Sequence, residues 1–148
     1  MLAAIAALSR ELGALAVAPL YRSAPQSSIA QPDFLNTVVV ARGEVEPEEL
    51  LAFVKELERE AGRQPGERWG PRPLDVDLLL VGDERRAGAE LELPHPRLRE
   101  RSFVLAPLAD LLPHLPLPPD GRTAHELLTQ LPRDESLVRV AWNAAATT

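Results

Sequence analysis

The segment from residue 67 to residue 83 constrains the fold of this chain more than any other part of the sequence. Its first half is rich in Gly, Pro and Arg and predicts a loop, while the apolar run at 78–81 predicts a buried strand. Asp75 and Asp77 therefore stand where a strand leaves the core. Side chains two residues apart on a strand share a face and lie about 6.6 Å apart along it. That spacing suits two divalent cations about 3.5–4 Å apart, and carboxylate oxygens make magnesium the first candidate.

An Asp-x-Asp pair has an ordinary alternative, since the solvent-facing side of a half-buried strand often carries acidic residues. The flanking residues favour a binding site instead. Arg68, Trp69 and Arg72 precede the pair and are separated from it by a turn. Carboxylates for metal, guanidinium groups for phosphate oxygens and an indole together indicate a site for the phosphates of a nucleotide. No G-x-x-x-x-G-K-[S/T] motif occurs, which excludes a P-loop kinase.

The run Arg-Trp-Gly-Pro-Arg-Pro-Leu-Asp-Val-Asp-Leu-Leu at 68–79 closely resembles the signature of the 6-hydroxymethyl-7,8-dihydropterin pyrophosphokinases, and Gln-Pro-Asp-Phe-Leu-Asn at 31–36 is typical of the same family. The resemblance extends over most of the chain. It implies a cytoplasmic enzyme of folate biosynthesis that transfers diphosphate from ATP to a pterin alcohol and releases AMP. It also implies two Mg2+ ions, and an α+β, ferredoxin-like fold with a mostly antiparallel sheet and helices on one face. Other folate-pathway enzymes are candidate partners.

The composition agrees with one soluble domain over residues 1–148, in which about 132–148 form a C-terminal extension. A chain of 148 residues buries roughly 70% of its unfolded surface. The net charge of −6 and the absence of a Lys/Arg block disfavour nucleic acid as a partner. The chain contains no Cys, which excludes thiolate chemistry. No apolar run is long enough for a membrane span, and the apolar start at 1–12 lacks the features of a signal peptide.

Periodicity and turn residues predict the order of the elements. A helix at 2–12 should end at Gly13 in a left-handed cap. A strand at 15–22 contains Pro19, which predicts an edge position or a bulge. The sequence then predicts a loop at 23–33, a strand at 34–41, a helix from Pro47 to near Gly62 and an Arg-rich lid loop. After the paired aspartates it predicts a turn at 83–88, an extended piece at 91–96 and an apolar helix through Leu112. The last predicted elements are a capped helix after Thr123, a closing strand at 137–142 and a loose tail.

The resemblance assigns roles on the nucleotide side of the site. It implies that Arg68, Arg72 and Arg101 contact ATP phosphates, that Arg63 is the first arginine of a lid, and that His95 contacts the triphosphate. The lid loop is about one residue shorter than in the family and lacks a second lid arginine. Glu58 matches a helix glutamate near the nucleotide, and Trp69 is expected to pack on the closed lid. Among these groups Arg63 and Arg72 join Asp75 and Asp77 as the catalytic set. For a single surface Arg, and for a lone His, a structural role is the ordinary alternative, and we expect His114 and His125 to be structural.

A pterin is flat, with an edge of donors and acceptors. The resemblance implies that Phe34 and Phe103 sandwich it, each stack contributing about 0.5–1.5 kcal/mol beyond burial. Asn36 has one acceptor and two donors with which to contact the edge. Ser23 would offer backbone or hydroxyl contacts at the start of the loop. The alternative is that both phenylalanines belong to the core.

One departure from the family concerns the N-terminus. Family members begin with a strand that ends in Gly-Ser-Asn-Leu-Gly, whereas this sequence starts within the following helix. Met1 is then an internal methionine, or the sequence is shortened. In either case we expect unpaired strand edges, and a chain extended upstream should be more stable and more active.

Two other readings stay open. One is a non-catalytic module that binds a small molecule on a ferredoxin-like scaffold, and its mark would be ligand binding without nucleotide consumption. The other is an Asp-x-Asp metal transferase that uses nucleotide sugars, for which Phe34, Asn36 and Phe103 have no obvious purpose.

Overall fold

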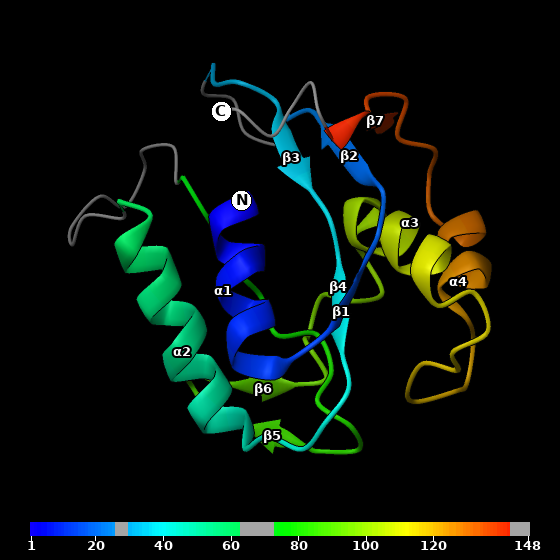
Figure 1. The fold of residues 1–148 in the computed structure, drawn as a ribbon. Coiled ribbons are helices and arrows are strands. Elements are labelled where there is room, and N and C mark those ends of the chain that lie inside the picture. The colour runs from blue at the N-terminus through cyan, green and yellow to red at the C-terminus, as the bar shows by residue number, and fades with distance from the viewer. Residues whose placement is uncertain (26–29, 63–72, 143–148) are drawn as a thin grey trace. The chain divides into compact units, whose positions relative to one another are not determined.

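A computed structural model describes residues 1–25, 30–62 and 73–142 of the chain (Figure 1). Its elements follow the order α1 (Leu2–Leu12), β1 (Leu15–Val17), β2 (Leu20–Ser23), β3 (Phe34–Asn36), β4 (Val39–Ala41), α2 (Pro47–Glu60), β5 (Arg86–Ala87), β6 (Glu92–Leu93), α3 (Ser102–Leu111), α4 (Ala124–Gln130) and β7 (Val138–Val140). All strand pairs are antiparallel, in sheets β1-β4, β3-β2-β7 and β5-β6. The predicted α+β class with an antiparallel sheet is therefore confirmed.

The chain divides into two compact units. The first joins Met1–Gly13 to Arg42–Pro96, and the second joins Ala14–Ala41 to the chain from Arg97 onward. The single domain over residues 1–148 stays a prediction. Over the described ranges, every helix is too short or too polar to cross a bilayer.

In the first unit, α1 and α2 are amphipathic helices at the predicted positions. Helix α1 buries Ala4 and Leu8, and it ends at Gly13, whose N–H donates to the carbonyl of Ser9 at 2.9 Å. Gly13 has φ +89° as expected, but its ψ of −158° is not that of a left-handed cap, because the chain leaves the helix directly in an extended conformation. That detail of the prediction is wrong.

Helix α2 begins with Pro47 and carries two glutamates in its first turn, as the sequence predicts. It buries Val54, Leu57 and, unexpectedly for a charged residue, Glu58. The hairpin pairs β6, in the predicted extended piece, with β5. The turn predicted at 83–88 is therefore wrong at Arg86 and Ala87, which form β5. The guanidinium group of Arg86 ties this hairpin to α2 through an ion pair with Glu48.

The second unit shows why the two long predicted strands are each divided. Pro19 has no N–H and interrupts the first strand, so that β1 pairs with β4 while β2 pairs with β3 and β7. At the break, the N–H of Ala18 donates to the carbonyl of Val38 at 2.9 Å, and the hydroxyl of Thr37 donates to the carbonyl of Ala18 at 3.1 Å. The backbone groups at the interruption therefore have partners, and the chain passes from one small sheet to the next.

Helices α3 and α4 pack together in the same unit, and α3 also contacts β2 and β3 (Figure 1). Residues 105–108 of α3 are buried, and Leu105 is fully enclosed. Thr123 caps α4 as predicted, with its hydroxyl oxygen accepting the N–H of Glu126 at 3.3 Å. The predicted closing strand is confirmed as β7, which pairs with β2.

The segment at 75–81 differs from its prediction. It forms no strand among the described residues, and residues 78–81 are half-buried rather than buried. Strand assignment requires a ladder of hydrogen bonds. Among the described residues, the backbone bonds to this segment are from the N–H of His95 to the carbonyl of Leu79 and, in the following turn, from the N–H of Glu84 to the carbonyl of Val81, both at 2.9 Å. The alternation expected of an extended chain is nevertheless retained, because Asp75 and Asp77 are exposed and Val76 between them is half-buried.

Candidate functional site

The paired aspartates are in the first unit, shortly after the stretch 63–72, which the structure does not describe. Because exposure alternates along 75–77, the side chains of Asp75 and Asp77 lie on the same side of the chain. The side chain of Asp77 is 51% exposed, so water or an ion reaches its oxygens. Two accessible carboxylates on one side fit a Mg2+ ion, which takes one or two protein carboxylates and completes its shell with water and substrate phosphates.

Glu58 fixes the backbone between the two aspartates. Its carboxylate is on α2, is only 3% exposed, and accepts the N–H of Val76 at 3.2 Å. Lys55, one helical turn earlier, places its ammonium group 4.0 Å from the other carboxylate oxygen. The sequence predicted that Glu58 lies near the nucleotide, and the structure gives it a contact that was not predicted. The contact fixes the backbone N–H of the residue between the two aspartates.

His95 lies beside the same pair. Its Nε2 is 3.8 Å from a carboxylate oxygen of Asp77, and its side chain is 17% exposed. Its backbone N–H donates to the carbonyl of Leu79, two residues beyond Asp77. Both the backbone and the side chain of His95 therefore contact the segment that carries the aspartates. The structure thus brings together four of the predicted site residues in this unit: Glu58, Asp75, Asp77 and His95. Among the described residues, no group of three or more His, Cys, Asp or Glu forms a complete metal cage.

The residues predicted to contact the ring lie in the second unit. Ser23 and Phe34 are opposite each other in the β2-β3 register, and Tyr21 is opposite Asn36. Directly opposed residues, and residues two apart on one strand, share a face of the sheet. Ser23, Phe34 and Asn36 therefore occupy one face, together with Tyr21. The side-chain amide of Asn36 donates to the hydroxyl of Ser23 at 2.9 Å, which fixes the orientation of the amide.

Phe34 is not a core residue. It is 43% exposed, among the most exposed large apolar side chains of the described chain. The alternative that Phe34 is part of the core is therefore wrong for this residue. An accessible ring next to an oriented amide can stack on a flat ligand.

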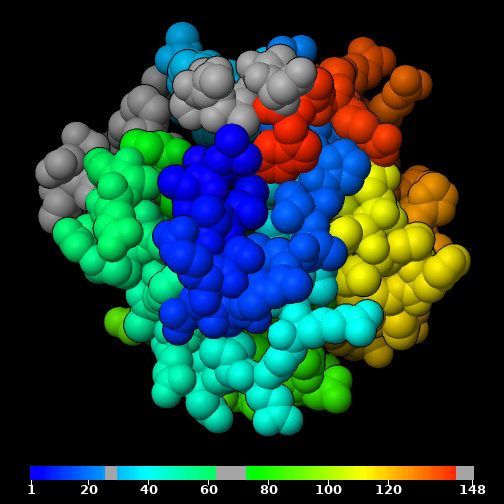
Figure 2. All heavy atoms as spheres, viewed as in Figure 1, coloured from blue at the N-terminus to red at the C-terminus, as the bar shows by residue number. Residues whose placement is uncertain are grey.

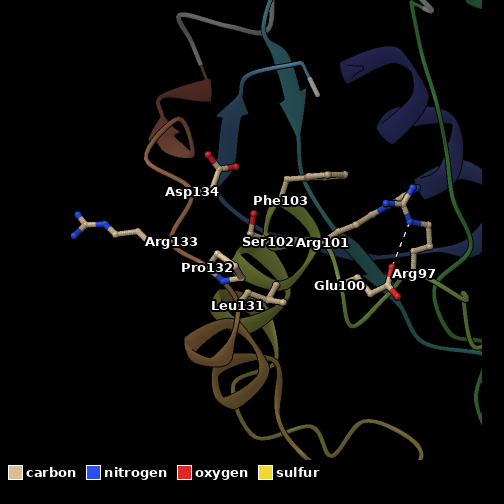
Figure 3. A pocket seen from close by; sticks show the side chains of 9 residues that line it. All are labelled: Arg97, Glu100, Arg101, Ser102, Phe103, Leu131, Pro132, Arg133 and Asp134. Atoms are coloured by element: carbon tan, nitrogen blue, oxygen red, sulfur yellow. Dashed lines mark ion pairs between the residues drawn. The ribbon is translucent and has the colours of Figure 1, made fainter. Parts of the chain in front are cut away.

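Arg101 and Phe103 are at the start of α3, where Arg101 is the N-cap residue. The guanidinium carbon of Arg101 is 5.6 Å from the centre of the Phe103 ring, a cation–π contact. A cavity of about 330 Å3 opens here, large enough for a small ligand. It is lined by Arg97, Glu100, Arg101, Ser102, Phe103, Leu131, Pro132, Arg133 and Asp134 (Figure 3).

The sequence did not predict a network that braces the same sheet. The hydroxyl of Tyr21 donates to the carboxylate of Asp110 on α3, and Arg139 on β7 donates to both, at 3.2 Å to Tyr21 and 2.9 Å to Asp110. Burial, followed by the bond to Asp110, raises the pKa of the Tyr21 phenol. Because Tyr21 is opposite Asn36, the network holds α3 against the face that carries the residues predicted to contact the ring. No local motif could have joined three residues so far apart in the sequence.

Four predicted site residues, Arg63, Arg68, Trp69 and Arg72, lie outside the described residues. Their assignment to the lid and to the ATP phosphates therefore stays a prediction.

Comparison with known proteins connects these observations. The chain matches the family described as 7,8-dihydro-6-hydroxymethylpterin-pyrophosphokinase over residues 1–113. It is 45% identical over 118 residues to a 2-amino-4-hydroxy-6-hydroxymethyldihydropteridine pyrophosphokinase of Pseudomonas aeruginosa, a match that covers 80% of this chain and 72% of that protein. A protein of Bacillus subtilis with the same name is 42% identical over 95 residues, covering 64% of this chain and 57% of that protein.

A longer relative is similar over the same region. The mitochondrial folate synthesis bifunctional protein of Arabidopsis thaliana is 52% identical over 93 residues, which are 63% of this chain but only 17% of that protein. The chain thus spans a small part of the bifunctional relative and most of the Pseudomonas enzyme. Since the family match extends over most of the sequence and includes the Asp75–Asp77 segment and the strands that carry Ser23, Phe34 and Asn36, the chain belongs to the 7,8-dihydro-6-hydroxymethylpterin-pyrophosphokinase family.

Proposed function

We propose that this chain transfers the terminal diphosphate of ATP to 6-hydroxymethyl-7,8-dihydropterin, giving AMP and the pterin diphosphate. One observation carries the proposal: two exposed aspartates stand on either side of a half-buried residue, and a buried glutamate accepts the backbone N–H of that residue. The family match supports the same reaction. A sugar-nucleotide transferase is disfavoured, because it leaves the exposed Phe34 and the oriented Asn36 without a purpose.

We propose that Asp75 and Asp77 hold two Mg2+ ions. The metal supplies neutralisation of negative charge on the phosphate oxygens when it is bound. Through the ions that they would hold, the aspartates would fix the position of the triphosphate. His95, 3.8 Å from Asp77, is near enough to contact a phosphate oxygen bound there. Arg101, together with Arg63, Arg68 and Arg72, would supply further positive charge toward the phosphates. Trp69 would pack on the lid.

Phe34 and Phe103 would stack on the pterin. The amide of Asn36 is already oriented by its bond to Ser23, and it still offers a second N–H and a carbonyl oxygen to the polar edge of the ring. An oriented amide loses less conformational entropy on binding than a mobile one. These residues therefore favour a flat heterocycle with donors and acceptors along one edge.

In the reaction, the hydroxymethyl oxygen of the pterin forms a bond to the β-phosphorus of ATP. The bond between that phosphorus and the oxygen bridging to the α-phosphate breaks, and AMP leaves with the electron pair. The alcohol proton goes to solvent, and we assign no residue as general base. Such a transfer needs alignment and charge neutralisation more than covalent participation of the protein.

An assay for AMP, with and without the pterin alcohol, tests the proposal. We expect AMP only when both substrates and Mg2+ are present. Asp75→Ala and Asp77→Ala should each lower turnover by about 100-fold or more, with circular dichroism unchanged. Asp83→Ala, an exposed aspartate in the following turn, is the matched control and should be as active as the wild type. Retained activity in either of the first two variants contradicts the assignment. Pterin binding without AMP formation would instead support the non-catalytic module.

We propose the cytoplasm as the compartment, which a chain without Cys allows. The name of the Arabidopsis relative states a mitochondrial location, so fractionation of cells that express the full-length protein is the test. The same relative is a bifunctional protein of folate synthesis, which makes another folate enzyme a reasonable partner for this chain.

A further inference from the structure

The segment after α4 lies beyond the 1–113 region of the family match and packs along β2. Strand β7 pairs with β2, and the indole of Trp142 donates to the carbonyl of Ala18 at 3.3 Å. Figure 2 shows the orange and red residues of this segment against the blue residues of β2. The second edge of the strand that ends at Ser23 is therefore occupied by the C-terminal segment.

Ser136 extends this pairing with its side chain. The β2-β7 register places Leu20 opposite Val140 and Arg22 opposite Val138. Two residues further on, Ser136 falls opposite Ala24, beyond the end of both strands. There the hydroxyl oxygen of Ser136 accepts the N–H of Ala24 at 3.1 Å. The hydroxyl takes the place of a backbone carbonyl and adds one bond to the ladder.

Asp134 fixes the orientation of that hydroxyl. One carboxylate oxygen of Asp134 accepts both the N–H of Ser136 at 2.9 Å and its hydroxyl at 2.6 Å. A serine hydroxyl has one proton, and that proton is used on Asp134, so toward Ala24 the oxygen can only accept. Hydrogen bonds to a carboxylate are about twice as strong as neutral ones. Asp134, Ser136 and Ala24 thus form a directed chain of bonds.

The chain of bonds ends next to two groups of the candidate site. Ala24 directly follows Ser23, whose hydroxyl accepts the amide of Asn36. At its other end, Asp134 lines the cavity that also contains Phe103, and Figure 3 shows Asp134 near Ser102 at the start of α3. A shift of Ser136 would therefore move the end of β2, and with it the oxygen that orients Asn36.

We propose that Ser136 and Asp134 are positioning residues for the pterin, acting through the end of β2 and the amide of Asn36. The inference rests on the proposed function, because it concerns the affinity for the substrate of that reaction. Neither residue contacts the nucleotide or the metal in this account. Their loss should weaken recognition of the pterin and leave ATP recognition unchanged.

The experiment compares Ser136→Ala and Asp134→Ala with two matched controls in the full chain. Ser136→Thr keeps the hydroxyl, and Glu135→Gln removes an exposed carboxylate between the two positions. We expect Ser136→Ala and Asp134→Ala to raise the KM for the pterin alcohol about 3- to 10-fold, the effect of one lost hydrogen bond. The KM for ATP should stay within about twofold, a change too small to indicate a lost contact, and both controls should resemble the wild type.

A readout without turnover accompanies the kinetics. Amide hydrogen exchange of Ala24 should be faster in Ser136→Ala than in wild type and Ser136→Thr, and the pterin alcohol alone should bind the variant more weakly. An unchanged KM for the pterin in Ser136→Ala overturns the inference. An equal rise in the KM for the pterin and the KM for ATP also overturns it, as does the same rise in the KM for the pterin in Glu135→Gln. Failure of the wild type to form AMP overturns the proposed function and this inference with it. A wild type that is active, with variants that are indistinguishable from it, overturns the inference alone.

Discussion

Glu58 illustrates how a single residue links the core to the chemistry of the site. An ionised carboxylate is costly to bury unless hydrogen bonds and an opposite charge compensate for lost hydration. Glu58 has both, from the N–H of Val76 at 3.2 Å and from Lys55 at 4.0 Å. The bond to Val76 holds the one residue that separates the two aspartates. Its burial is therefore explained by the position that it gives to Asp75 and Asp77.

Two replacements of Glu58 distinguish the role of its hydrogen bond from the role of its charge. We expect Glu58→Ala to lower kcat by roughly 10- to 100-fold, since misplaced catalytic groups cost about that much. The free energy of unfolding should fall by about 1–3 kcal/mol, because the N–H of Val76 loses its partner. Glu58→Gln keeps an oxygen in place and should retain most of the activity. Steady-state kinetics and urea unfolding provide the measurements, and full activity in Glu58→Ala would refute the positioning role.

Tyr21 is the one tyrosine of the chain, so its ionisation can be followed by tyrosinate absorbance without interference. Burial, and then the bond to Asp110, raise its pKa above 10.0 in the folded protein. A raised pKa means that the contribution of Tyr21 to stability is complete below the unfolded value and is lost as pH rises through the folded value. Tyrosinate should therefore appear at higher pH in the native protein than in denaturant.

Two variants give opposite shifts in this titration. Asp110→Asn removes a group that raises the pKa and should lower it toward 10.0, whereas Arg139→Gln removes a group that lowers the pKa and should raise it further. The stability lost between neutral and alkaline pH should therefore be smallest in Asp110→Asn and largest in Arg139→Gln, because this loss grows with the difference between the folded and unfolded pKa. Shifts in the same direction for both variants would contradict the network.

At the scale of whole elements, the sequence predicted which segments are helices and strands better than where strands divide. Helices α1 and α2 were predicted within two residues of their observed ends, because apolar periodicity and the residues at their termini agree. The strand at 15–22 was predicted as continuous, although Pro19 indicated a bulge. Pro19 breaks the strand, but the groups that bond to the backbone at the break, the hydroxyl of Thr37 and the carbonyl of Val38, are distant in sequence. Pairing across such distances has no local signal.

The segment that leads into α3 is tied to the turn before α4 by one ion pair. The guanidinium of Arg99 binds both carboxylate oxygens of Asp120 at 2.8 Å, and it also donates to the carbonyl of Pro118 at 2.9 Å. Hydrogen bonding to Arg99 lowers the pKa of Asp120 from 3.8 to about 2. A lowered pKa contributes stability above the unfolded value, and that contribution is lost as pH falls from 3.8 through about 2.

We expect Asp120→Asn to be less stable than the wild type at neutral pH, and the difference to close as pH falls through about 2. Urea unfolding along a pH series gives the comparison, with Asp83→Asn as the control for losing an exposed carboxylate. The effect should weaken in high salt, since both partners are partly exposed. A constant difference at every pH would show that the charge of Asp120 contributes nothing.

At the scale of the whole molecule, short motifs indicated the residues of the candidate site but not the residues that hold them in position. The Asp-x-Asp pair and the residues Phe34 and Asn36 could be singled out because each stands in a recognisable run. The contributions of Ser136, Asp134 and Arg139 could not, since they depend on register with β2 and not on local pattern. The segment after α4 was predicted to be a C-terminal extension, yet through β7 it supplies the second neighbour of the strand that ends at Ser23.

The metal should bind only together with the nucleotide. Among the described residues, no third acidic or imidazole group completes a cage around the aspartates, and a Mg2+ ion needs six oxygen ligands, of which phosphates can supply several. We therefore expect Mg2+ alone, or a non-hydrolysable ATP analogue alone, to leave the melting temperature nearly unchanged. Both together should raise it, because a ligand that binds only the native state adds stability in proportion to RT ln(1 + [L]/Kd). EDTA should abolish AMP formation without unfolding the protein, and Asp77→Ala should lose the combined shift. A large stabilisation by Mg2+ alone would instead require a complete protein site for the ion, and the pair of aspartates could not then be its main ligands.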